Sequence, residues 1–137
     1  MEIHLKIIGT ILIGLALVHV IFPRYFDWVN DLKPVSLINR QMMYVHTLFV
    51  ALVVLLNGLL CITSSAELAE TDLGHKICLG LFIFWFVRLV IQFFGYSADL
   101  WRGKKFETMV HIMFSILWLY FSVTFFMVFW NGVNTAE

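Results

Sequence analysis

Five polar side chains of this sequence lie inside long apolar segments, where a polar group needs a reason to be present. His19, His46 and His111 each lie in a different segment, three or four residues from one of its ends. Arg88 and Gln92 lie four residues apart in a further segment, and so on one face of a helix. An arginine at the centre of a membrane helix costs roughly 2.5 to 3.5 kcal/mol, so each group is expected to have a partner or a function. The sequence therefore predicts a polar layer to which all four segments contribute.

The favoured chemistry for this layer is cofactor binding. Haem b needs two imidazoles at one depth as axial ligands, an aromatic pocket and cations for its propionates. We expect His46 and His111 as the ligands, and His19 as a third ligand or as a partner that orients them. Arg88 would balance the charge of a propionate or an anionic substrate, and Gln92 would be a hydrogen-bond partner. The predicted function is redox or electron transfer.

The same side chains fit other chemistries. A non-haem Zn or Fe enzyme acting on a lipid-soluble substrate would use His19, His46 and His111, with Glu107 as a base or fourth ligand. A proton or ion pathway would use these groups without a metal. A pocket for an anionic lipid or a quinone would set Arg88 opposite the head group, with a histidine as hydrogen-bond donor. No sequence motif names a metal, so these alternatives, and whether the protein is an enzyme at all, stay open.

Structural roles compete with these functions. Each histidine could bond to a backbone carbonyl or to water, and Arg88 could pair with Asp99 or Glu107. Asn57 is expected to form a hydrogen bond between helices. In that case the protein would be a non-catalytic accessory subunit whose polar layer only fixes helix packing.

Four long apolar runs must position these residues, and they cover residues 3–22, 42–62, 77–95 and 108–130. A bilayer core of about 30 Å needs roughly 20 helical residues, so each run is long enough to cross it. Only 13% of the residues are charged, whereas soluble domains carry about 25%. The expected fold is all-α: a polytopic membrane protein forming one up-down bundle of four transmembrane helices over residues 1–137.

The distribution of Lys and Arg predicts the orientation. Six of these residues lie in the first and third connections: Arg24, Lys33, Arg40, Arg102, Lys104 and Lys105. Only Lys6 and Lys76 lie at the opposite side. By the positive-inside rule, the first and third loops face the cytoplasm and both termini lie outside, as in a bacterial inner-membrane protein. The first run is expected to be a retained helix and not a cleaved signal peptide.

Local signals predict how the helices end and how they pack. Pro23 is expected to end the first helix and Gly95 the third, and Ser64 or Ser65 to begin a short segment in the middle loop. One face of the fourth helix is expected to point inward; it carries His111, Ser115, Trp118 and Ser122. Four glycines are candidates for close packing between helices or subunits: Gly9, Gly14, Gly58 and Gly80.

The composition also limits the partners. Nine Lys and Arg balance nine Asp and Glu, so there is no basic field to hold nucleic acid. Two cysteines, Cys61 and Cys78, are too few for a disulfide framework, and whether they form one bond stays open. The expected partners are the lipid bilayer, a quinone or other lipid-soluble substrate, and further copies of the chain or a larger membrane complex.

Overall fold

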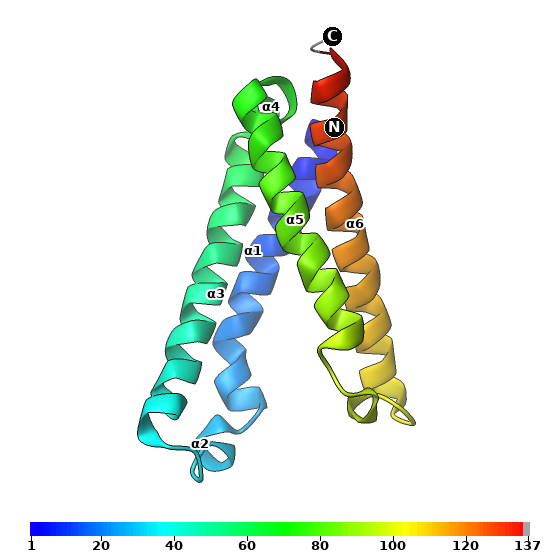
Figure 1. Cartoon of the computed structure of the whole chain (residues 1–137). Helices are drawn as coiled ribbons and strands as arrows, with labels where there is room; N and C mark the ends of the chain where they lie inside the picture. The colour runs from blue at the N-terminus through cyan, green and yellow to red at the C-terminus, as the bar shows by residue number, and fades with distance from the viewer. Residues whose placement is uncertain (136–137) are drawn as a thin grey trace. The chain divides into compact units, whose positions relative to one another are not determined.

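The computed structural model describes residues 1–135, which form helices joined by short connections and no strand (Figure 1). The elements are α1 (Glu2–Tyr25), α2 (Trp28–Asp31), α3 (Leu37–Thr63), α4 (Ser65–Glu70), α5 (Asp72–Phe94), the 3-10 helix η1 (Ala98–Leu100) and α6 (Lys105–Thr135). The predicted all-helical class is therefore confirmed.

Four helices are long and apolar enough to cross a membrane: α1, α3, α5 and the part of α6 from Lys105 to Asn134. Their mean hydropathy lies between 2.1 and 2.4. They contain the four predicted apolar runs, apart from Gly95, which follows the last residue of α5. The number and location of the long helices are thus as predicted.

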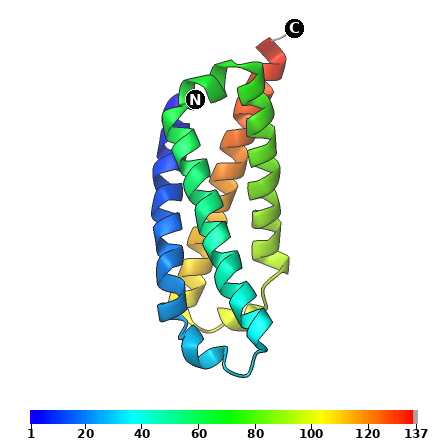
Figure 2. The ribbon, with the colours of Figure 1, turned by 90° about the vertical axis from the view of Figure 1, so that its left-hand side faces the viewer.

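The chain divides into two compact units. The first, Ile3–Ser65, holds most of α1, all of α2 and all of α3. The second holds α4 from Ala66 onward, α5, η1 and α6, together with the first two residues of the chain. Each unit is built on one antiparallel helical hairpin, α1–α3 and α5–α6 (Figure 2).

In the first unit, α1 and α3 approach each other closely at two glycines. The carbonyl oxygen of Gly58 lies 2.7 Å from the point where a Cβ on Gly9 would stand, and that of Gly9 lies 2.9 Å from the corresponding point on Gly58. A side chain at either position would meet backbone, so only glycine permits this approach. Gly14 and Gly80 differ, because no atom lies within 4 Å of their Cβ positions. Of the four predicted glycines, two therefore form a helix contact.

The prediction that Pro23 ends the first helix is wrong, since α1 continues to Tyr25. Proline removes one hydrogen bond, here the one that an N–H at position 23 would give to the His19 carbonyl. The helical hydrogen bonding resumes after the proline, since the Phe26 N–H donates to the Phe22 carbonyl at 3.0 Å. The helix ends where Asp27 adopts a left-handed conformation with φ of 45°.

In the second unit, α5 begins five residues before the predicted start because a cap extends it. The Thr71 hydroxyl accepts a hydrogen bond from the Gly74 N–H at 2.9 Å, and Asp72 adds negative charge to the first turn. The short middle segment exists as α4, and it begins at Ser65. At the other end of α5, the Gly95 N–H donates to the Ile91 carbonyl at 2.8 Å, which confirms the predicted end. Cys61 and Cys78 are both buried, and neither forms a disulfide bond within residues 1–135.

Candidate functional site: a polar network between α5 and α6

Aromatic packing sets the register between α5 and α6. The indole rings of Trp85 and Trp118 stack with centroids 5.0 Å apart and planes 13° apart, and Phe82 contacts Phe126 at 5.2 Å. Trp118 and Ser122 are buried, as expected for the inward face of the fourth helix. With the tryptophans paired in this way, Gln92 of α5 lies opposite His111 of α6.

A hydrogen-bonded chain connects three of the predicted site residues. Nη1 of Arg88 donates to Oε1 of Gln92 at 3.1 Å, one turn along the same helix. Nε2 of Gln92 lies 2.8 Å from Nδ1 of His111, across the helix pair. Gln92 is buried, with 7% of its surface exposed, so its amide group depends on these two partners. The predicted grouping of Arg88, Gln92 and His111 is therefore present in one hairpin.

The order of donors and acceptors in this chain follows from the arginine. A guanidinium has only donors, so it must face the amide oxygen of Gln92, and the amide NH₂ group must then face His111. Nδ1 of His111 consequently accepts, and the ring hydrogen of the neutral imidazole lies on Nε2. The network uses the acceptor at Nδ1 and leaves the Nε2–H donor of His111 for another partner.

Aromatic rings hold the imidazole of His111 on two sides. Trp101 stacks on it with centroids 4.0 Å apart and planes 10° apart, and Phe93 meets it edge-on at 5.9 Å. The loop that carries Trp101 is tied to α6, because the Thr108 hydroxyl donates to the Trp101 carbonyl at 2.7 Å. Sequence reasoning missed this stacking. The only signal for it is the shortness of the connection between Gly95 and Lys104.

Arg88 carries a charge that no carboxylate balances in residues 1–135. Its guanidinium lies over the rings of Trp118, at 5.1 Å from the centroid, and Tyr96, at 5.7 Å. Ion pairs with Asp99 or Glu107, the structural alternative, are absent from this part of the chain. Two aromatic faces and one amide oxygen are its partners, and these give weaker compensation than an anion.

The other two predicted histidines belong to the first unit and have different surroundings. Nδ1 of His19 donates to the Leu15 carbonyl at 2.7 Å, and its ring lies 4.8 Å from that of Phe22. His46 is exposed on α3, and its side chain has no hydrogen bond or ring contact within residues 1–135. The side chain of Asn57 also forms no hydrogen bond within residues 1–135, and its predicted bond between helices stays a prediction. The convergence of His19, His46 and His111 would join residues of both units and stays a prediction.

The metal and haem assignments also stay predictions. Within residues 1–135, no group of three or more His, Cys, Asp or Glu side chains could hold a metal ion. A histidine that binds metal through Nε2 donates from its other nitrogen, whereas Nδ1 of His111 accepts from Gln92. Binding of haem b, Zn or Fe at His111 would require the Gln92 amide to turn and present its NH₂ group to Arg88.

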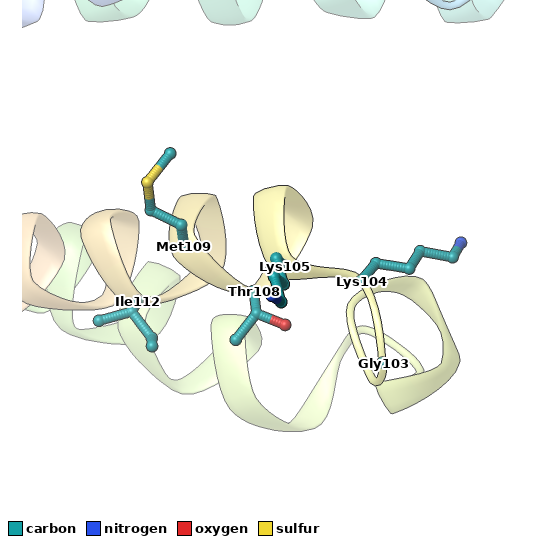
Figure 3. A pocket seen from close by; sticks show the side chains of 6 residues that line it. All are labelled: Gly103, Lys104, Lys105, Thr108, Met109 and Ile112. Carbon is teal, nitrogen blue, oxygen red and sulfur yellow. The ribbon is translucent and has the colours of Figure 1, made fainter.

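An open pocket lies at the start of α6, beside the basic loop. It has a volume of about 570 Å³ and is lined by Gly103, Lys104, Lys105, Thr108, Met109 and Ile112. In Figure 3, the Lys104 side chain extends away from Met109 and Ile112.

Comparisons with known proteins assign no function to this site. No protein-family description, no curated protein and no solved structure matches the chain.

Proposed function

We propose that the chain is an integral membrane protein in which α1, α3, α5 and α6 cross the bilayer as an up-down bundle. The length and hydropathy of the four helices support this proposal. The excess of Lys and Arg in the first and third connections favours a cytoplasmic location for these loops, with both termini outside, as in a bacterial inner membrane.

Within this bundle, we propose that the α5–α6 hairpin binds a lipid-soluble molecule through an oxygen-bearing head group. The observation that carries the proposal is that Arg88 and His111 have N–H donors that the network does not use, while no carboxylate in residues 1–135 pairs with Arg88. The two acceptors of the network already accept hydrogen bonds: Oε1 of Gln92 from Arg88, and Nδ1 of His111 from Gln92. Arg88 and the Nε2–H of His111 remain as donors, and donors recognise carbonyl, carboxylate or phosphate oxygens.

The depth of the site suits an amphiphile. Arg88 lies six residues before the end of α5, which corresponds to about 9 Å along the helix. A molecule whose tail lies in the bilayer can bring its head group to this depth from the cytoplasmic interface. Trp101, Phe93 and Tyr96 supply aromatic surface around the donors. Quinones and anionic lipids both have the required combination of apolar tail and acceptor oxygen.

Native mass spectrometry of the protein, released from a mild detergent, tests this function. We expect a bound lipid-soluble molecule on the wild type and its loss from both Arg88→Gln and His111→Phe. Phenylalanine keeps a ring against Trp101 and removes both nitrogens. Arg102→Gln is the matched control, because Arg102 lies in the exposed loop outside the network.

His46→Phe separates this function from haem binding. The haem b prediction requires His46 as an axial ligand, whereas the proposed hairpin site does not use it. We expect His46→Phe to retain the bound molecule. Loss of a haem mass from both His46→Phe and His111→Phe would contradict the proposal, and so would a wild type that carries no lipid-soluble molecule.

A further inference from the structure

Two further donors lie beside Arg88, and neither has a partner. The indole rings of Trp85 and Trp118 are buried, with 2% and 6% of their surfaces exposed. Their Nε1 atoms form no hydrogen bond within residues 1–135. A buried tryptophan N–H usually finds an acceptor, because leaving it unpaired forfeits the bond that it makes to water in the unfolded chain.

The two unpaired donors and the unbalanced charge belong to one cluster. Trp85 precedes Arg88 by three residues on α5, so the two lie on neighbouring positions of one helix surface. Trp118 stacks on Trp85, and the guanidinium lies over Trp118 at 5.1 Å. One of the five guanidinium N–H groups is used by Gln92. The cluster therefore holds two unpaired indole N–H groups beside one positive charge that no acidic side chain balances within residues 1–135.

We infer that the ligand of this hairpin is an anionic amphiphile with a single carboxylate, held by Arg88 and the indole N–H groups of Trp85 and Trp118. This inference rests on the proposed function and narrows its ligand class. A neutral quinone would satisfy donors and leave the charge of Arg88 unbalanced in a medium of low dielectric constant. A carboxylate supplies one negative charge against one positive charge, and its two oxygens match the planar fork of a guanidinium.

Binding of tritium-labelled oleate to the protein in phosphatidylcholine nanodiscs tests the inference. Competition with unlabelled oleate, oleyl alcohol, ubiquinone and dioleoyl phosphatidate gives the relative affinities. The alcohol has the same tail without the charge. We expect oleate to bind at least about 10-fold more tightly than oleyl alcohol, in line with a charge-assisted pair of hydrogen bonds.

The variants assign this preference to the cluster. We expect Arg88→Gln to abolish the difference between oleate and the alcohol. Arg88→Lys should keep the preference with weaker binding, because it keeps the charge and loses the fork. Trp85→Phe and Trp118→Phe keep an aromatic ring and remove the N–H, so each should weaken oleate binding several-fold. Trp130→Phe and Arg102→Gln are the matched controls and should bind oleate as the wild type does.

The possible outcomes separate the inference from the function on which it rests. Equal binding of oleate and oleyl alcohol, or tighter binding of ubiquinone, would overturn the inference that the ligand carries a carboxylate. The proposed function of the hairpin would still stand if His111→Phe loses binding. Binding of phosphatidate more tightly than oleate would also overturn the inference and would identify a phosphate as the preferred head group. If none of the four amphiphiles binds, the inference is overturned, and native mass spectrometry then decides whether the hairpin holds any ligand.

Discussion

The two helical hairpins of this protein use similar polar side chains in different ways. The α1–α3 hairpin carries two imidazoles and an amide: His19 bonds within its own helix, His46 is exposed, and Asn57 has no side-chain hydrogen bond in the described residues. In the α5–α6 hairpin, the amide of Gln92 bonds to the imidazole of His111 across the helix pair and to Arg88. Of the two hairpins, the candidate site is therefore the one in which polar side chains bond to each other across the helix pair.

The packing of the two hairpins differs in the same sense. The first depends on a close approach of backbones at Gly9 and Gly58, which leaves no room for side chains. The second depends on stacked aromatic rings, led by Trp85 and Trp118. The Trp85–Trp118 stack sets the register at which Gln92 of α5 meets His111 of α6. The glycine contact therefore brings two helices together, and the aromatic contact aligns the polar side chains of the candidate site.

The largest effect is expected from Gly58→Leu. The added side chain would meet the Gly9 carbonyl and the backbone of Ile13, so α1 and α3 must separate at a cost of about 1–3 kcal/mol or more. Thermal unfolding in detergent, followed by circular dichroism, measures the loss. Gly14→Leu is the control, since nothing lies near its Cβ position. Equal melting temperatures for the two variants would refute the close helix contact.

A smaller loss of stability is expected from Gln92→Leu. This change leaves Nδ1 of His111 and one donor of Arg88 without their partner, and a buried unpaired polar group costs about 1–3 kcal/mol. Asn57→Leu is the matched control in the other hairpin and should be neutral or stabilising. Unfolding by titration with sodium dodecyl sulfate gives both free energies. A larger cost for Asn57→Leu would reverse the contrast between the hairpins.

Trp101→Ala should have a modest effect on stability and a specific effect on the site. A stacked pair contributes about 0.5–1.5 kcal/mol beyond its buried area, and Trp101 also covers one face of His111. We expect weaker ligand binding in the native mass spectrum with nearly unchanged helix content. Trp28→Ala, which removes an edge-on contact with Tyr44 in the first unit, should leave ligand binding unchanged; an equal decrease in both variants would contradict a local role for Trp101.

The smallest effect is expected from His46→Ala, although the sequence predicts His46 as a haem ligand. Because His46 is exposed and has no side-chain contact in the described residues, its removal should change stability by less than about 0.5 kcal/mol. An absorption spectrum of the purified protein provides the decisive comparison. A reducible Soret band that disappears in both His46→Ala and His111→Ala would establish haem ligation and join the two hairpins in one site.

The sequence predicts the long helices well, because each coincides with an apolar run of about 20 residues, the length that a helix needs to cross a bilayer core. It also identifies Arg88, Gln92 and His111 one by one as polar groups in apolar surroundings. It does not reveal which of them meet. A helix that is apolar all round has no pattern that tells its inward face from its outward face, so His46 and Gln92 look equally suited to a site.

The contacts that complete the site depend on tertiary structure. The bond between Gln92 and His111 requires the register set by the Trp85–Trp118 stack, and neither tryptophan has a sequence signal for this pairing. The position of Trp101 depends on a loop that is held by a hydrogen bond from Thr108. Pro23 shows the same limit for local rules, because a proline in the last turn removes one bond and the helix continues past it.

The protonation of His111 tests the proposed site most directly. Nitrogen-15 NMR of the protein in bilayers, with His111→Phe to assign the signal, reports which ring nitrogen carries the hydrogen. We expect a neutral ring with hydrogen on Nε2 and an accepting Nδ1 whose shift changes in Gln92→Leu. Hydrogen on Nδ1 with a bare Nε2, the form that binds a metal, would contradict the donor site at Arg88, Gln92 and His111.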